Sequence, residues 1–517
     1  MSTSQPAARA AARIGGGPER RNLIEGPIGK TLFLFALPVL GGNALQNLNG
    51  TVNAFWVSHS LGEVAISAIS NANIIMMLML GAVFGISMAA NILIAQSFGA
   101  GDLPMVKRVV GTATTFFVVL SGGLAILGGV LSPQILTAMG TPPDARAEAI
   151  AYLRVIFAAM PFMYFFAFMQ MAQRGAGDSR TPFYFMILAV ALDMTLNPLL
   201  IRGIGPFPKM GIAGSATATF IAQGISLACM MVFLYRRQSH LLLRWGDLHL
   251  LKPDPTILRA LVVKGLPMGV QMLVMSVAAL MMIRLVNGYG SLTTAAYGAS
   301  QQVWTYVQMP AMALSAAVSS MAAQNVGARR WDRVAEVARK GVAIGLAITG
   351  SVVVILYLLG DIVFWVFLPA HSAALPIAHH INLIVLWAFM LFSVTFTLFG
   401  VVRATGAVWA PLFILIISMW IIRIPFATAL MPRFGADAIW WSFPLGTVTS
   451  AGLAALYYRF GGWRKAHFLD EKPKGDGADT GLATPPMREE AKPFLIGGGD
   501  GADATVTLAA DPAPGAS

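Results

Sequence analysis

Long apolar stretches recur along most of the chain, and they constrain its fold more than any other feature of the sequence. An apolar helix of about 20 residues is long enough to cross a bilayer. The chain contains twelve stretches of about that length, and 56% of its residues are hydrophobic while 11% are charged. Soluble domains carry about 25% charged residues. The sequence therefore predicts an all-α integral membrane protein with twelve transmembrane helices.

The twelve segments form two sets of six. The approximate limits of the first set are 29–57, 65–95, 106–131, 147–172, 181–203 and 211–235. Those of the second set are 258–287, 293–323, 335–358, 376–402, 411–431 and 437–460. We therefore expect two six-helix lobes, over residues 28–240 and 258–465, with a cytoplasmic linker at 241–257. The composition of the two ends predicts a disordered basic arm at residues 1–27 and a disordered tail at 466–517.

Lysine and arginine residues orient the segments, because cytoplasmic loops of membrane proteins are enriched in them. With both termini in the cytoplasm, 28 of the 35 Lys and Arg residues belong to the cytoplasmic side. The exceptions are Arg146, Arg154, Arg202, Lys209, Arg284, Arg423 and Arg433. The net charge of +12 therefore does not indicate a nucleic-acid partner. We expect a multi-pass protein of the plasma membrane, which is the inner membrane in a bacterium, with both termini cytoplasmic.

The two halves of the chain are copies of one another. The matched pairs are Gln96 with Gln324, Gly99 with Gly327, Pro38 with Pro267, and Pro182 with Pro411, at an offset of 228 or 229 residues. Each half has an even number of spans, so both halves begin on the same side of the membrane. Parallel repeats of this kind are related by an axis along the membrane normal. In transporters built this way, the substrate site lies near the midplane between the halves, and rocking alternates access.

One ionisable residue lies deep inside the fifth apolar segment. Asp193 stands in TPFYFMILAVALDMTLNPLLI (181–201), and an aspartate at such a depth costs about 2.5–3.5 kcal/mol on insertion scales. Apolar surroundings favour the protonated form of a carboxyl group, so Asp193 is suited to binding and releasing a proton near neutral pH. Its candidate hydrogen-bond partners, all uncharged, are Asn53, Thr195, Asn197, Ser215 and Thr217. The alternative is a structural aspartate that fixes the packing of neighbouring helices.

The second half contributes candidates for a substrate cavity. Trp304, Tyr306 and Met309 stand in QQVWTYVQMP, and aromatic and methionine side chains suit a cavity that adapts to varied ligands. Packing or lipid-facing roles are the alternative for each of them. Arg423 lies inside the eleventh segment, in WIIRIP. We expect it either to snorkel toward the membrane surface or to satisfy carbonyl groups freed by Pro425, with substrate contact as the alternative.

The remaining motifs indicate no catalytic or metal site. The two GAGD sequences, at 99–102 and 175–178, lack the GK[ST] of a phosphate-binding loop. His379 and His380, with His371 nearby, lack a further ligand in register for a metal. We therefore expect no catalysis, no cofactor and no metal ion. The GxxxG sequences that begin at Gly81 and Gly341 predict close helix contacts.

Taken together, the motifs resemble the multidrug and toxic compound extrusion (MATE) family over about residues 28–462. The stretches that carry the resemblance are NAFWVSHSLGEVAISAIS (53–70), AQSFGAGD (95–102), RGAGDSRTPF (174–183), LNPLLIRGIG (196–205), GIAGSATATFIAQ (211–223), MAAQNVGARR (321–330) and IIRIPFATAL (421–430). The resemblance implies two six-helix lobes that form a V-shaped cavity. It also implies export of amphipathic, often cationic, compounds in exchange for protons or sodium.

Three places depart from the pattern of that family. Its members commonly carry an aspartate near the end of span 1, where this chain has Asn53. In span 5 they commonly have Asn, then Asp four residues later, whereas this chain has Asp193 and then Asn197. Sodium-coupled members carry a glutamate in span 7, and the matching residue here is Met275. The last departure favours protons, because a hard cation such as sodium needs several oxygen ligands.

The residues and the family resemblance together predict a monomeric, proton-coupled efflux antiporter, and the resemblance implies that it exports amphipathic, cationic small molecules. Three alternatives stay open. A lipid-linked saccharide flippase of a related fold would need a more cationic cavity for its anionic headgroup. A membrane-embedded hydrolase or transferase would need a nucleophile with a base, or a metal site, at one depth. An ion channel would also suit a duplicated membrane protein.

Overall fold

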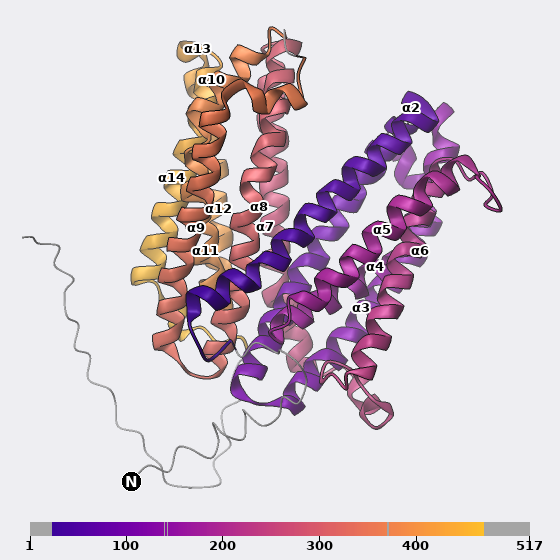
Figure 1. Cartoon of the computed structure of the whole chain (residues 1–517), viewed down its shortest axis with the longest axis vertical. Coiled ribbons are helices and arrows are strands. Elements are labelled where there is room, and N and C mark those ends of the chain that lie inside the picture. Colours follow the sequence, from indigo (N-terminus) through magenta and orange to yellow (C-terminus); the bar gives the residue numbers. More distant parts are fainter. Residues whose placement is uncertain (1–22, 139, 142, 370–371, 470–517) are drawn as a thin grey trace, which may run out of the picture. The chain divides into compact units, whose positions relative to one another are not determined.

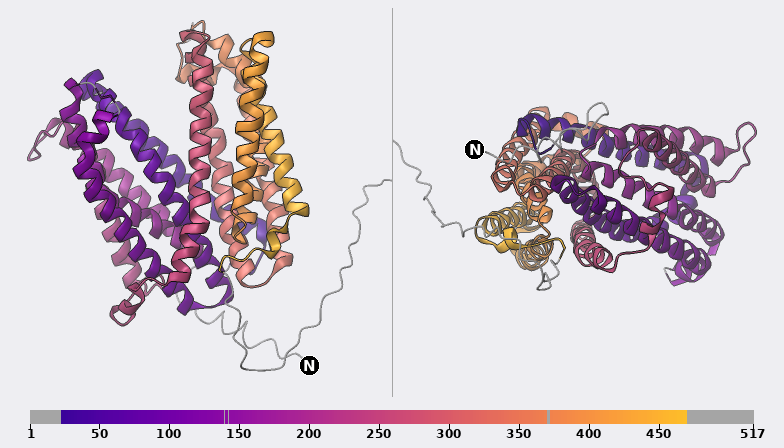
Figure 2. Two further views of the ribbon diagram at one scale, coloured as in Figure 1. Left: turned by 180° about the vertical axis from the view of Figure 1, so that it is seen from behind. Right: turned by 90° about the horizontal axis from the view of Figure 1, so that it is seen from below.

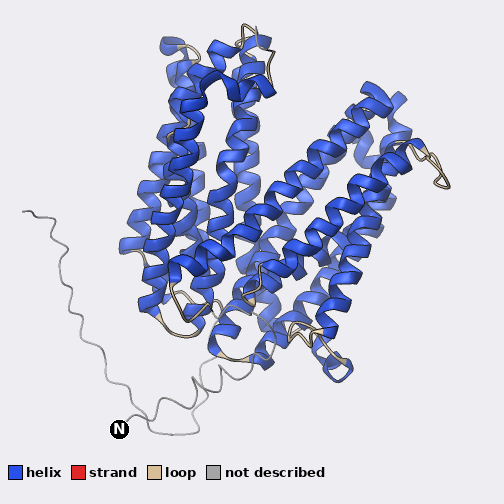
Figure 3. Ribbon diagram, in the orientation of Figure 1, coloured by secondary structure: helices blue, strands red, loops and turns tan. Residues whose placement is uncertain are grey.

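A computed structural model describes residues 23–138, 140–141, 143–369 and 372–469. These residues belong to one compact unit, and a second unit, Glu471–Ser517, lies outside the described residues. The basic arm expected at 1–27 and the tail expected at 466–517 also lie almost entirely outside them. All regular secondary structure in the described ranges is helical (Figure 3). The all-α prediction is therefore confirmed.

Each predicted span lies on one helix or on consecutive helices. The first half of the chain holds α2 (Ile28–Ala100), α3 (Leu103–Ala138), α4 (Pro143–Gly175), α5 (Arg180–Arg202) and α6 (Ile212–Arg236). The second half holds α7 (Pro255–Asn287), α8 (Ser291–Gly327), α9 (Trp331–Leu359), α10 (Leu375–Val385), α11 (Ala388–Ala404), α12 (Trp409–Ile416), α13 (Ile424–Phe434) and α14 (Asp437–Phe460). Short helical segments are η1 (Trp245–Leu251), η2 (Gly360–Val366), η3 (Ile417–Arg423) and η4 (Gly462–Lys465).

Some helices carry more or less than one span. Helix α2 contains the first two spans, and α10 with α11 forms the tenth, bent by 47° at the break between them. The eleventh span runs without a break from α12 through the π-helical segment η3 into α13. By length and hydropathy, nine helices among the described residues can cross a membrane, or ten with the bent pair. Helices α8 and α14 also have spanning length but are more polar, and α8 buries polar residues such as Ser319 and Asn325.

The helices form two bundles, as Figure 1 shows. We call α2–α6 the N-lobe and α7–α14 the C-lobe. The two bundles lie close together at one end and diverge toward the other, and the view from behind in Figure 2 agrees. The two lobes are those that the sequence predicted, and their V-shaped arrangement is the one that the family resemblance implied.

Glycine lets helices of different lobes and of one lobe approach closely. A Cβ atom on Gly85 of α2 would overlap the backbone of Gly265 and Gly269 in α7. Within the C-lobe, a Cβ atom on Gly341 of α9 would lie 2.8 Å from the Val318 side chain of α8. The close helix contacts predicted from both GxxxG sequences are therefore confirmed.

At the end where they meet, the lobes exchange two equivalent hydrogen bonds. Gln96 Nε2 of the N-lobe donates to the carbonyl oxygen of Ala404 in the C-lobe at 2.7 Å. Gln324 Nε2 of the C-lobe donates to the carbonyl oxygen of Gly175 in the N-lobe at 2.8 Å. We call this contact the glutamine joint. The two glutamines are a matched pair of the duplication, so the joint has approximate twofold symmetry.

The glycines of the same motifs permit the close approach at this joint. A Cβ atom on Gly99 would overlap the backbone carbonyl group of Gln324, and a Cβ atom on Gly327 would overlap that of Gln96. Helices α2 and α8 therefore cross here with backbone against backbone. Only glycine fits at both positions without a shift of one lobe relative to the other.

The linker between the lobes packs against the N-lobe. Lys107 Nζ of α3 forms an ion pair with Asp247 Oδ2 of η1 at 2.7 Å. Thr115 Oγ1 donates to the carbonyl oxygen of Leu251 at 2.6 Å. Asp254 then caps α7 by accepting from the backbone N–H of Thr256 at 2.9 Å. The linker thus orients the first helix of the C-lobe relative to α3.

Candidate functional site

Asp193 lies in the middle of α5, and its carboxyl group is buried inside the N-lobe. The residue is 3% exposed. Asn49 Nδ2 of α2 donates to Asp193 Oδ2 at 2.7 Å, and Thr219 Oγ1 of α6 donates to Oδ1 at 3.0 Å. Each carboxyl oxygen therefore accepts one hydrogen bond from an uncharged donor on a neighbouring helix. We call Asn49, Asp193 and Thr219 the aspartate layer.

A second group of polar side chains lies one helical turn away from Asp193. Asn197 Nδ2 of α5 and Ser215 Oγ of α6 both donate to Asn53 Oδ1 of α2, at 3.0 and 2.7 Å. We call these three residues the asparagine layer. The opposite amide oxygen, Asn197 Oδ1, is buried and has no hydrogen-bond partner. The asparagine layer thus keeps one acceptor available.

Helical geometry explains why there are two layers. Each of the three helices contributes two residues four positions apart, and such residues share a face about 6 Å apart along the axis. The pairs are Asn49 with Asn53, Asp193 with Asn197, and Ser215 with Thr219. The order is reversed on α6 because α6 runs antiparallel to α5. The six side chains therefore form two stacked sets of three.

The sequence interpretation needs correction at this point. The donors to Asp193 are Asn49 and Thr219, neither of which was expected, while Asn53, Asn197 and Ser215 bond to each other instead. Thr195 donates to its own backbone at Ala191, at 2.9 Å. Thr217 likewise donates to the carbonyl of Ala213 at 2.8 Å.

The reason lies in the helical repeat. Thr195 and Thr217 each lie two positions from the residues of the two layers, and two positions correspond to about 200° around a helix. Their side chains therefore leave on another face. The four-residue spacing from Asn53 and from Ser215 was the signal that could have identified Asn49 and Thr219.

The electrostatics of the aspartate layer leave the carboxyl group without a counterion. Among the described residues, no Lys, Arg or His side chain forms an ion pair with Asp193. Tyr152 of α4, also buried, lies close enough to interact electrostatically with it. A buried, unpaired carboxylate is destabilising by several kcal/mol in effect, so neutralisation by a proton or by a bound cation is strongly favoured. The layer can therefore exchange one positive charge.

A metal centre is not evident. Among the residues that the structure describes, no group of three or more His, Cys, Asp or Glu side chains is placed to hold a metal ion. His380 Nε2 instead lies 2.8 Å from Asp437 Oδ1, and His371 lies outside the described residues. Oxygen atoms of Asp193, Asn53 and Asn197 are the groups that a hard cation would use in the N-lobe.

The proposed cavity residues of the C-lobe divide between two environments. Trp304 and Met309 of α8 are buried, whereas Tyr306 is 54% exposed. Trp304 Nε1 donates to Asn382 Oδ1 of α10 at 2.6 Å. Residues 304 and 306 lie two positions apart and so point to opposite sides of the helix. The structure brings Trp304 into an aromatic core and leaves Tyr306 outside it.

Arg423 also enters this aromatic core. It is the last residue of the π-helical segment η3, and its Cζ atom lies 3.3 Å from the ring centroid of Phe443 in α14. The ring centroid of Trp304 lies 4.9 Å from that of Phe443. Phe443, which the sequence reasoning missed, therefore links Trp304 to Arg423.

The expected role of Arg423 as a donor to backbone carbonyls is not what the structure shows. Arg423 Nε is buried and has no hydrogen-bond partner. No hydrogen bond joins its guanidinium group to a carbonyl freed by Pro425 among the described residues. The Arg423 Nε donor therefore remains available for another acceptor.

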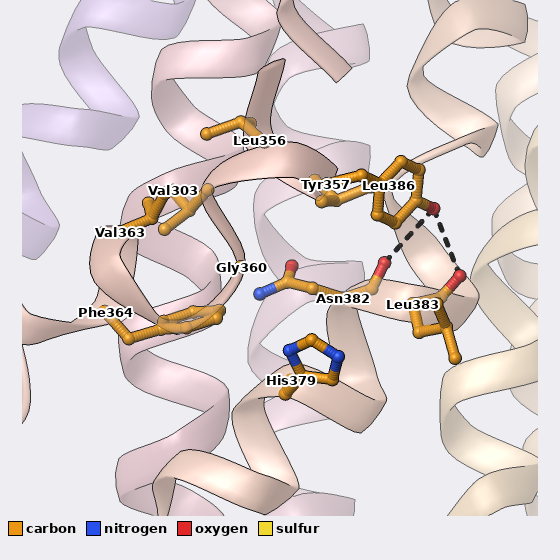
Figure 4. Close-up of a pocket in the computed structure, with 10 residues that line it drawn as sticks. All are labelled: Val303, Leu356, Tyr357, Gly360, Val363, Phe364, His379, Asn382, Leu383 and Leu386. Carbon is orange, nitrogen blue, oxygen red and sulfur yellow. Dashed lines mark hydrogen bonds between the residues drawn. The ribbon is translucent and has the colours of Figure 1, made fainter. Parts of the chain in front are cut away.

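A pocket in the C-lobe lies beside Trp304 and is drawn in Figure 4. Its walls come from α8, α9, η2, α10 and Leu386, and they include Val303, Phe364 and His379. Tyr357 on its rim donates to the carbonyl oxygen of Leu383 at 3.1 Å. Asn382, which also accepts from Trp304, forms part of the same wall. The lining is mostly apolar and positions no obvious reactive group.

Comparison with known proteins reveals relatives over almost the whole described chain. The family model MatE matches residues 38–199 and again residues 267–428. The probable multidrug resistance protein YoeA of Bacillus subtilis is 35% identical over 84% of this chain and 94% of its own length. The probable multidrug resistance protein NorM of Thermotoga maritima is 25% identical over 86% of this chain and 94% of its own.

Solved structures resemble the fold at lower identity. One described as the outward-facing conformation of a multidrug resistance MATE family transporter has a TM-score of 0.78 at 20% identity. It covers 86% of this chain and 98% of that one. A crystal structure of MATE in the straight conformation also has a TM-score of 0.78 at 20% identity, with the same coverage.

Proposed function

Because the chain belongs to the MatE family, we propose that it is a secondary active antiporter that exports amphipathic, cationic small molecules in exchange for protons. We infer a transport function, and no catalytic one, from the names of its relatives, which are probable multidrug resistance proteins. The two lobes alternate access by rocking about the end where they meet. The protein acts as a monomer in the plasma membrane, with both termini in the cytoplasm.

The observation that carries the proposal is the aspartate layer. Asp193 is buried at membrane depth and accepts hydrogen bonds from two uncharged donors. Uncharged donors orient the carboxyl group but leave its charge to be neutralised by a proton or by the substrate. A carboxyl group that binds either the proton or the substrate, but not both, couples the inward flux of protons to the outward flux of substrate. Binding of the cationic substrate releases the proton, and protonation releases the substrate.

The position of the carboxyl group distinguishes this chain from the common pattern of its family. Both places where relatives commonly carry an aspartate hold asparagine here, Asn53 and Asn197, and these two bond to each other. The single carboxyl group lies one turn along α5, in the neighbouring layer. The proposal therefore assigns the coupling charge to the aspartate layer and an orienting role to the asparagine layer.

Flux measurements in vesicles test the coupling. Purified protein reconstituted into liposomes should drive uptake of several fluorescent organic cations when an imposed pH gradient is present. Dissipating the gradient with a protonophore should stop the flux, and replacing sodium with potassium should leave it unchanged. Sodium-dependent flux that ignores the pH gradient would show that the ion assignment is wrong.

A further inference from the structure

We propose that Arg423 forms, with Tyr297 and Gln301, a subsite in the C-lobe that binds an acidic group of the transported compound. The inference rests on the proposed function insofar as it takes the ligand to be the exported molecule. The ligand class it names is an aromatic amphiphile that bears a carboxylate or a similar anionic group. A zwitterion of this class would present its cationic group to the N-lobe.

The Arg423 guanidinium group has no anionic partner among the described residues. It stacks on Phe443, and no carboxylate among the described residues forms an ion pair with it. Its Nε atom is buried without a partner. A buried donor left unsatisfied costs about 1–3 kcal/mol, and more for a charged group. A ligand that supplies an acceptor at this place therefore gains a charge-assisted hydrogen bond that the empty protein lacks.

The second argument is the neighbouring hydroxyl group. Tyr297 of α8 is buried, and its ring packs against Phe443, the ring on which Arg423 stacks. Its hydroxyl oxygen accepts from Gln301 Nε2 at 3.3 Å, which leaves the hydroxyl proton to be donated. Arg423 has no lone pair to accept it. The arginine and the tyrosine, which both pack against Phe443, can therefore both donate to one anionic oxygen of a ligand.

The third argument is the aromatic frame. The ring centroids of Tyr297 and Phe443 lie 6.3 Å apart, and those of Trp304 and Tyr297 lie 5.6 Å apart. Aromatic side chains offer a large, rigid apolar surface next to the charged donor. The ligand best matched to this frame carries its acidic group on or beside an aromatic ring system.

Asp193 and Arg423 occupy corresponding positions along the fifth and eleventh spans. Helix α5 begins at Arg180 and α12 at Trp409, 229 positions apart, but Asp193 and Arg423 are 230 apart. The π-helical segment η3 lies between the start of α12 and Arg423, and a π-helical turn takes up one more residue than an α-helical turn. The π-helical segment η3 therefore accommodates the one additional residue. Arg423 therefore lies at the level of the C-lobe that Asp193 occupies in the N-lobe.

A matched pair of dyes tests the subsite. Rhodamine 110 carries a free carboxylate beside its cationic ring system, and rhodamine 123 is its methyl ester, which keeps the cation and loses the anion. Equilibrium binding of both dyes to the purified full chain is measured by fluorescence anisotropy. The unaltered protein should bind both, and Arg423→Gln should weaken binding of rhodamine 110 by about 10-fold or more while leaving rhodamine 123 within about 2-fold.

Three further variants control this experiment. Arg423→Lys keeps the charge but loses the planar fork, so it should retain part of the affinity for rhodamine 110. Arg284→Gln removes an exposed arginine of α7 and should leave the binding of both dyes unchanged. Tyr297→Phe keeps the ring and removes only the hydroxyl group, so it serves if Arg423→Gln does not fold. This variant should weaken the binding of rhodamine 110 by about 5-fold and leave that of rhodamine 123 unchanged.

Several results would overturn the subsite. These are failure of the unaltered protein to bind rhodamine 110, equal loss of both dyes in Arg423→Gln, and unchanged binding of both dyes in Arg423→Gln or Tyr297→Phe. Equilibrium binding needs no ion gradient. Failure of proton coupling would therefore appear only in the vesicle flux, and failure of the subsite only in the binding difference between the two dyes.

Discussion

The N-lobe and the C-lobe are copies of one segment, yet the corresponding fifth and eleventh spans place side chains of opposite charge near their middle, Asp193 and Arg423. In the N-lobe, the carboxyl group of Asp193 is surrounded by amides and hydroxyl groups. In the C-lobe, the guanidinium group of Arg423 stacks in an aromatic core. By contrast, the glutamine joint is the same in both copies.

This difference separates two kinds of constraint. The joint involves both lobes at once, and each glutamine bonds to a backbone carbonyl of the other lobe, so a change on one side disturbs both. The interior of a lobe is constrained only by its own packing, and it has diverged. A duplicated frame can therefore hold two unlike groups of interior side chains.

The largest expected effect belongs to the carboxyl group of the N-lobe. Asp193→Asn should abolish gradient-driven efflux in vesicles, because the amide keeps the shape and loses the titrating proton. Adding Asn197→Asp should restore part of the flux, since the carboxyl group then moves one turn to the asparagine layer. Asp247→Asn, an acid in the linker, is the control and should transport normally. Normal transport by Asp193→Asn, with unchanged pH dependence, would remove the N-lobe carboxyl group from the mechanism.

The joint should respond equally on its two sides. Gly99→Ala and Gly327→Ala each place a methyl group against a backbone carbonyl of the opposite lobe. Overpacking of this kind is destabilising by about 1–3 kcal/mol, so both variants should lower the thermal unfolding midpoint and the flux by similar amounts. Gly50→Ala and Gly298→Ala lie on the same two helices with nothing within 4 Å, and they serve as controls. A large effect on one side only would contradict the symmetry of the joint.

Within the N-lobe, the two layers should differ in importance. Asn49→Ala removes a donor to the carboxyl group itself, and hydrogen bonds to charged groups are the stronger ones. We expect efflux to fall by about 10-fold. Asn53→Ala removes the acceptor of the asparagine layer and should have a smaller effect. If Asn53→Ala proves the more damaging, the asparagine layer carries more of the coupling than the aspartate layer.

The smallest effect concerns the first turns of the third span of each lobe. The hydrogen bond from Lys107 holds the pKa of Asp247 below its usual value. Such a group stabilises the folded state above its unfolded pKa of about 3.9 and loses that effect as the pH falls through its lower folded pKa. Asp247→Asn should therefore reduce stability at pH 7 by about 0.5 kcal/mol. The difference in unfolding midpoint between the two proteins should disappear as the pH is lowered below about 4.

The matching end of the C-lobe provides the control for this pair. Glu336 and Lys340 of α9 pair within one helix at 2.7 Å, and they hold no linker. Glu336→Gln should therefore change the unfolding midpoint less than Asp247→Asn does. An equal change in both variants would mean that the linker contact adds nothing to an ordinary surface ion pair.

The sequence by itself determined the frame of this protein. The twelve apolar segments and the duplication follow from the lengths of the apolar runs and a constant offset, and the helices lie where they were expected. Asp193 was identifiable for the same reason, because a charge inside a membrane-length apolar run stands out without any knowledge of its neighbours. The glutamines and glycines of the joint were visible as matched motifs, although their contact across the lobes was not.

Only the tertiary structure decided which side chains meet. It joined Asp193 to Asn49 and Thr219, placed Thr195 and Thr217 on other faces, and set Arg423 on Phe443 through a π-helical turn. The physical reason is the rotation of each helix about its own axis. A soluble helix shows its buried face as an apolar stripe. A membrane helix is apolar on nearly every side, so its sequence does not identify which face points into the protein. Packing against the neighbouring helices sets that rotation, and each residue of error turns a side chain by about 100°.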